Sequence, residues 1–72
     1  MKISYFPETD TLYFEISAQA SAESSEVSPG VVMDYDAEGN IVGIEVEQAG
    51  QKLDLEGLTL TQHPAPPHRR TA

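Results

Sequence analysis

The chain has 72 residues and a formal net charge of −8, from twelve acidic and four basic residues. This length is enough for one small domain, which buries only about 60% of the surface that its unfolded form exposes, so we expect a marginally stable monomer. The sequence has no cysteine, which excludes disulfides and thiolate metal sites. A partner subunit is therefore the expected source of additional stability.

The charge is concentrated in the first part of the chain. Residues 1–62 hold all twelve acids but only two bases, Lys2 and Lys52, which is a net charge of −10 over that span. Such a surface repels nucleic acid phosphates and anionic membranes and attracts basic partners. The sequence also has no long apolar run and no basic segment followed by a hydrophobic one at its N-terminus. We therefore expect no nucleic acid partner, no membrane association and a cytoplasmic location.

The first predicted element is a β-hairpin over residues 2–17. Two strand patterns, in residues 1–6 and 11–17, alternate apolar and polar side chains, so each strand has one apolar face. Pro7 begins the turn between them, because proline presets φ for a corner and cannot serve a central ladder. The predicted core-facing residues are Ile3, Tyr5, Leu12, Phe14 and Ile16.

A second β-hairpin is predicted over residues 30–47. It follows a small, polar loop at residues 18–25, and extended structure begins only near Glu26. Asp36 and Gly39 are the structural residues of its turn: the first can bond the backbone ahead of it, and the second can adopt positive φ. The predicted core-facing residues are Val31, Met33, Tyr35, Val42, Ile44 and Val46.

The strand pattern ends after the second hairpin. Ala49 and Leu53 are spaced for one face of a helix of about eight residues, which is too short to be stable alone and must pack on the sheet. Residues 58–61 alternate and are a candidate terminal strand. Residues 62–72 are rich in proline and lack core-forming side chains, so we expect a disordered tail.

These elements predict an α+β fold for residues 1–61, in which a four-stranded antiparallel sheet of two hairpins carries one short C-terminal helix on its apolar face. Four strands span about 15 Å, whereas an eight-residue helix is about 12 Å long and about 10 Å across. The helix therefore covers only part of the face. Either Leu55, Leu58 and Leu60 cover the remainder or a second copy does, and we expect a homodimer.

A recognisable pattern runs through four segments of the chain: residues 1–5, the turn at residues 7–8, the strand at residues 12–13 and the hairpin at residues 31–45. This pattern resembles a family of small bacterial proteins called domain of unknown function 2283. The resemblance covers roughly residues 1–55 and implies no established activity. Some members are similar to proteins encoded beside small ribonuclease-type toxins, which implies a candidate antitoxin-like role. Phe6, where the family usually has a polar residue, implies an additional exposed apolar group.

Acidic residues in the second hairpin have the spacing of an EF-hand calcium loop. The carboxylates are those of Asp34, Asp36, Glu38 and Glu45, arranged around Gly39. However, Glu38 is longer than the usual ligand there, and strands rather than helices flank the loop. A solvated acidic turn is the favoured interpretation. The alternative is a weak divalent-cation binder, or a hydrolase that uses the clustered carboxylates Asp34, Asp36 and Glu45.

The sequence contains no convincing catalytic set. Both histidines, His63 and His68, lie in the proline-rich tail, so no Ser/His/Asp arrangement is available to the folded body. No glycine-rich phosphate loop occurs either. We therefore expect no enzymatic activity, no cofactor and no metal site.

Two aromatic residues are predicted to lie outside the core. Phe6 and Tyr13 fall on the strand faces opposite the core-facing residues, where exposed aromatics favour a protein contact. Together with the acidic charge, they suggest a small homodimeric protein-interaction module. Its hypothesised role is that of an antitoxin-like partner of a basic protein.

Overall fold

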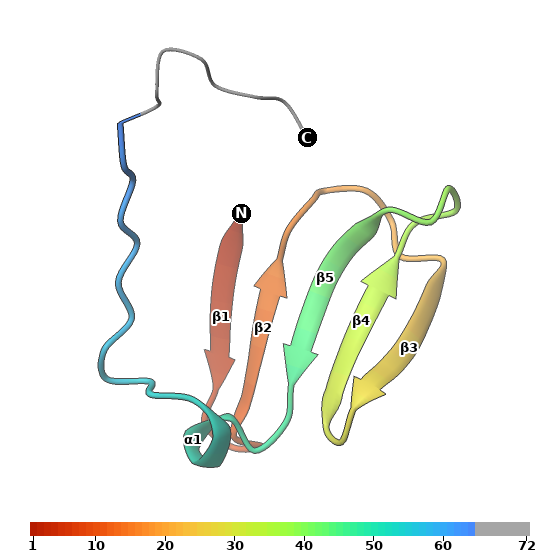
Figure 1. Cartoon of the computed structure of the whole chain (residues 1–72). Helices are drawn as coiled ribbons and strands as arrows, with labels where there is room; N and C mark the ends of the chain where they lie inside the picture. The colour runs from red at the N-terminus through yellow and green to blue at the C-terminus, as the bar shows by residue number, and fades with distance from the viewer. Residues whose placement is uncertain (65–72) are drawn as a thin grey trace.

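The computed structural model describes residues 1–64, which form an antiparallel sheet with a short helix at one end (Figure 1). Its strands are β1 (Lys2–Phe6), β2 (Thr11–Glu15), β3 (Glu23–Ser28), β4 (Val31–Tyr35) and β5 (Ile41–Val46), and its helix is α1 (Ala49–Lys52). The strand order is β1-β2-β5-β4-β3, so the two predicted hairpins meet at the centre through β2 and β5. β1 and β3 are the two edges of the sheet.

The register places the apolar side chains of both hairpins on one face. Tyr5 lies opposite Leu12 in the first hairpin, and Met33 lies opposite Ile44 in the second. Because side chains alternate along a strand, the partners of these residues in every strand fall on the same side of the sheet. The α+β class and the antiparallel sheet are therefore as predicted.

The predicted number of strands is wrong, because residues 23–28 form a fifth strand, β3, where a loop was expected up to residue 25. All six residues of β3 are exposed, so the strand has no hydrophobic alternation. Pairing with β4 holds it instead, reinforced by a hydrogen bond of 2.5 Å from the Ser24 hydroxyl to the Asp34 carboxylate. A strand that is held by hydrogen bonds rather than by burial leaves no periodic signal in the sequence.

The helix is also shorter than predicted. α1 has four residues, because Gln48 enters it in the left-handed conformation with φ 54° and Leu53 leaves it fully extended. Residues 53–64, which we call the arm, contain no helix and no strand, so the candidate strand at residues 58–61 does not form in this chain alone. Residues 65–72, which make up most of the predicted disordered tail, lie outside the described residues.

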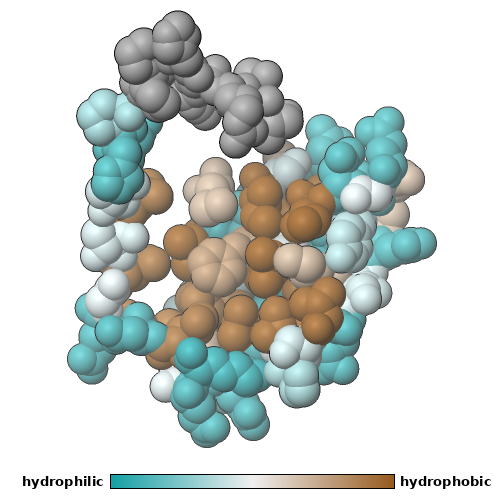
Figure 2. Space-filling view, in the orientation of Figure 1, coloured by the Kyte–Doolittle hydropathy of each residue, from teal (hydrophilic) through white to brown (hydrophobic). Residues whose placement is uncertain are grey.

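The small core lies at one corner of the apolar face. This face comprises the inward strand residues Ile3, Tyr5, Leu12, Phe14, Val31, Met33, Tyr35, Val42, Ile44 and Val46. Only Leu12, Val42 and Val46 among them are buried. Leu12 and Val46 pack with Ala49 of α1 at that corner, whereas Val42 lies toward the other end of β5, outside this cluster. Figure 2 looks onto this face, where hydrophobic side chains gather over the middle of the sheet and hydrophilic ones surround them.

Candidate functional site

The apolar face is the first candidate interaction surface of the described residues. Leu12, Val46 and Ala49 form a buried cluster at one corner of this face, and Leu55 of the arm packs against it. Val31, Met33 and Tyr35, the β4 residues of this face, remain half-buried, and on the β1 edge Ile3 is 39% exposed. One helical turn and one arm side chain thus cover a corner of the face and leave its remainder accessible.

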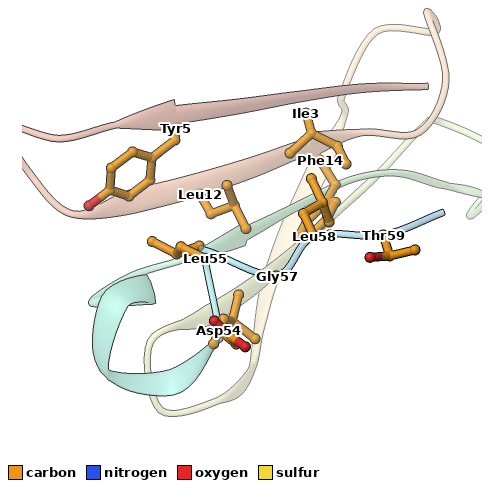
Figure 3. A pocket seen from close by; sticks show the side chains of 10 residues that line it. Ile3, Tyr5, Leu12, Phe14, Asp54, Leu55, Gly57, Leu58 and Thr59 are labelled. Atoms are coloured by element: carbon orange, nitrogen blue, oxygen red, sulfur yellow. The ribbon is translucent and has the colours of Figure 1, made fainter.

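An open groove of about 480 Å³ separates the arm from the β1–β2 part of the apolar face. Its walls are the sheet residues Ile3, Tyr5, Leu12 and Phe14 and the arm residues Leu53, Asp54, Leu55, Gly57, Leu58 and Thr59. Figure 3 shows Leu55 next to Leu12, with Leu58 and Thr59 following along the arm side of the groove. The groove is apolar along most of its length, so it suits aliphatic or aromatic side chains rather than a charged ligand.

Asp10 determines where the arm begins. Its carboxylate accepts hydrogen bonds from the Tyr5 hydroxyl at 2.7 Å and from the Gly50 N–H at 2.9 Å. Its carbonyl oxygen accepts a third from the Ala49 N–H at 2.8 Å. The hydrogen bond from Tyr5 to Asp10 raises the pKa of Tyr5 above its usual value. The sequence indicated only a turn at Asp10 and a core position at Tyr5, because the partners on α1 are 40 residues further along the chain.

Lys52 holds the other side of α1. Its ammonium donates hydrogen bonds to the backbone oxygens of Glu47 at 2.8 Å and of Pro29 at 3.0 Å, which ties the helix to the β3–β4 turn. Gly30 in that turn has φ 74°, and a Cβ at this position would collide with the Lys52 Nζ. A helix of four residues is therefore fixed from two sides, and it positions the arm that follows it.

The opposite, polar face carries a row of hydrogen bonds centred on Asp34. Tyr13 donates to one carboxylate oxygen at 3.1 Å, and Ser24 donates to the other. The Tyr13 ring crosses β5 above Gly43, where an added Cβ would lie 2.8 Å from Tyr13 Cζ. Partial burial, with the hydrogen bond to Asp34, raises the pKa of Tyr13. These hydrogen bonds link β2, β3 and β4. They also engage the Asp34 carboxylate, which the sequence suggested as a calcium ligand.

The carboxylates with calcium-loop spacing do not converge. The Asp36 carboxylate accepts hydrogen bonds inside its own turn from the N–H groups of Glu38 and Asn40, both at 2.9 Å. These backbone bonds lower the pKa of Asp36, the bond from Asn40 being the strongest cause. Asp34 and Glu45 lie on β4 and β5 outside that turn. Within residues 1–64, no three acidic or histidine side chains form a group able to hold a metal ion.

The turn of the second hairpin has the geometry that its sequence suggests. Gly39 has φ 86°, in the left-handed region that favours glycine. The Gly39 N–H donates to the Asp36 carbonyl at 3.1 Å, and the Asp36 N–H donates to the Asn40 carbonyl at 2.8 Å. This is a type I turn closed by a glycine bulge. Asp36 and Gly39 thus stabilise the turn of the hairpin, and the Asp36 carboxylate is occupied by hydrogen bonds within that turn.

Phe6 and Tyr13 share the polar face but differ in their surroundings. The pairing of Phe6 with Thr11, and of Ser4 with Tyr13, places both aromatic residues on the same side of β1 and β2. Phe6 is 50% exposed, whereas Tyr13 is half-buried because its ring lies over Gly43. Phe6 offers the accessible aromatic surface of the two, and a protein contact through this pair stays a prediction.

The two faces of the sheet differ strongly in charge. The strand residues of the polar face include one base, Lys2, and four acids, for a net charge of −3; the acids are Glu15, Glu26, Asp34 and Glu45. The corresponding residues of the apolar face include a single charge, that of Glu23, which lies opposite Tyr35 at the β3 edge. An apolar partner surface would therefore contact few charged groups on the apolar face and many on the polar face.

These features define a small α+β protein built on a five-stranded antiparallel sheet. The chain belongs to the family described as protein of unknown function (DUF2283), which matches residues 2–49 and confirms the resemblance found in the sequence. The match ends at the first residue of α1, so the arm lies beyond it. No curated protein and no solved structure matches the chain. In the part of the chain that the structure describes, no helix is long and apolar enough to cross a membrane.

Proposed function

We propose that the protein is a homodimeric protein-interaction module, with a binding rather than a catalytic role, whose apolar face packs against a second copy of the chain. The observation that supports this most directly is the mismatch between ten inward-facing apolar residues and a core that buries only three of them. Leaving such a face in water forfeits about 25 cal/mol for each Å² that is not buried. A domain of this size has little stability to spare.

The distribution of charge supports a second copy as the occupant of the apolar face. Two chains of net charge −8 repel each other, so contact requires that their acidic groups stay apart. Face-to-face packing brings together the surfaces whose strand residues carry only Glu23 and directs the acidic polar faces outward. Sheets that pack in this way lie about 10 Å apart, and the charges then remain in solvent at the periphery.

The outward polar faces suit a basic partner protein. Each carries a net charge of −3 from its strands, and Phe6 adds an apolar contact point at the β1 edge. Complementary charge steers such partners and improves the rate of association. Some members of the family that this chain resembles are similar to proteins encoded beside small ribonuclease-type toxins, and we propose an antitoxin-like role in the cytoplasm for this surface.

The test of the dimer compares two substitutions at neighbouring positions of β4. Met33→Glu places a carboxylate in the middle of the apolar face, whereas Val32→Glu places it on the polar face of the same strand. Met33→Glu should weaken the dimer at least about thirtyfold, because an unpaired charge would be buried, and Val32→Glu should change it by less than about threefold. Sedimentation equilibrium measures both, and equal dissociation constants for the two variants would show that the apolar face is not the interface.

A further inference from the structure

The apolar face alone is too small for a stable dimer. Five strands about 4.8 Å apart, with five or six residues at about 3.3 Å each, give a face of roughly 20 Å by 18 Å, or about 350 Å². A stable interface buries about 800 Å² on each partner. Projecting side chains give such a footprint somewhat more accessible surface than its plan area, but the sheet still falls short of this figure, so another part of the chain is needed to complete the interface.

The arm carries the apolar surface that the sheet lacks. Leu58 is 68% exposed and Leu60 is 96% exposed, so the chain's own sheet does not bury them. They alternate with Thr59 and Thr61, a pattern that presents both leucines on one side of an extended segment. Leu55, by contrast, packs on the core, and beyond it Leu58 and Thr59 border an open groove rather than a packed contact.

The arm is anchored at its origin and long enough to reach a second sheet. Asp10 and Lys52 fix α1, and the arm then runs alongside β1 and away from the sheet (Figure 1). Leu58 and Leu60 lie three and five residues beyond Leu55, so an extended arm places them up to about 10 Å and about 17 Å from it. A facing sheet about 10 Å away lies within that reach.

We propose that each copy's arm crosses to the other copy, where Leu58 and Leu60 pack on the β4–β5 part of the partner's apolar face. That part is the natural site because the chain's own Leu55 and α1 occupy the corner at Leu12 and Val46. A two-fold dimer makes the exchange reciprocal, so each apolar face receives the two leucines of the partner's arm. This inference rests on the proposed dimer and adds the segment that completes its interface.

Disulfide trapping tests the exchange directly, because the chain has no cysteine of its own. One variant carries Leu60→Cys, a second carries Met33→Cys with a mass tag, and the two are mixed and oxidised. A mixed disulfide requires close approach of residues on different copies, so a covalent heterodimer is the expected main product. In the control, the second variant carries Val32→Cys instead of Met33→Cys, which places the thiol on the polar face of the same strand. The yield of covalent heterodimer should then fall at least tenfold. Equal yields with the two thiols would overturn the proposal.

A pair of arm variants supplies an independent measurement. Leu58→Asp with Leu60→Asp should weaken the dimer at least tenfold, whereas Thr59→Asp with Thr61→Asp adds the same charge and should weaken it less than threefold. Equal weakening would mean that charge repulsion, not leucine packing, is responsible, and would contradict the exchange. If the wild type is a dimer and the leucine variant has the same dissociation constant, the arm exchange is refuted but the dimer is not. A monomeric wild type refutes the proposed function as well.

Discussion

Gly43→Ala is the substitution whose effect follows most directly from the geometry of the polar face. An added Cβ would overlap the phenol of Tyr13, at 2.8 Å from Cζ, and would come within 3.2 Å of the Asp34 carboxylate. Neither β5 nor β4 can shift without breaking its ladder, so the Tyr13 ring must move and its hydrogen bond of 3.1 Å to Asp34 is lost.

The net cost is the difference between two opposing effects. A hydrogen bond to a charged group contributes roughly 1.5–3 kcal/mol, and the accessible position of this one favours the lower value. Replacing glycine by alanine in a strand recovers about 0.5–1 kcal/mol of backbone entropy. We therefore expect Gly43→Ala to reduce the free energy of unfolding by about 1 kcal/mol.

A second background separates the clash from any other effect of the methyl group. In a Tyr13→Thr chain the ring is absent, so Gly43→Ala should become neutral or stabilising by up to about 1 kcal/mol. Urea unfolding at one fixed protein concentration measures both pairs, since dimerisation makes the stability concentration-dependent. The same loss of stability in both backgrounds would refute the packing of Tyr13 over Gly43.

Three further predictions concern the turn, the pH dependence and calcium. Gly39→Val should lower the free energy of unfolding by about 1 kcal/mol or more, because φ 86° is strained for a β-branched residue; an unchanged urea midpoint would contradict this. The raised pKa of Tyr13 means that the folded state holds the phenolic proton more tightly, so its stabilising contribution is present below a pH of about 10 and is lost as the pH rises further. The urea midpoint should accordingly fall as the pH is raised above about 10, and it should fall less in Tyr13→Phe. A midpoint that rises with pH would contradict the raised pKa of Tyr13. Millimolar calcium should give no saturable heat in calorimetry, and a melting temperature raised through Asp34, Asp36 and Glu45 together would reverse that expectation.

The parts of the fold that could be predicted are those with a local or periodic cause. Alternation places Met33 and Ile44 on one face whatever the neighbouring strand is, and the turn at Gly39 follows from residues within four positions of each other. Strand β3 has no such cause, because its six exposed residues depend on the β4 ladder rather than on burial. Its existence was therefore not visible in the sequence.

The candidate site divides in the same way. The apolar face could be predicted from alternation, and its cover proved smaller than expected, because α1 has only four residues. The anchor at Asp10 could not be predicted, since its partners Ala49 and Gly50 are some 40 residues away. Tertiary hydrogen bonds of this kind have no signature in residue spacing.

The most direct test of the proposed dimer is sedimentation equilibrium of the unmodified chain, from about 1 to about 500 µM and at low and high salt. We predict a monomer–dimer equilibrium that shifts slightly toward the dimer as salt screens the repulsion between two chains of charge −8. A monomer that persists at the highest concentration and still melts cooperatively would mean that the arm covers its own sheet, and the interface proposed for the apolar face would be wrong.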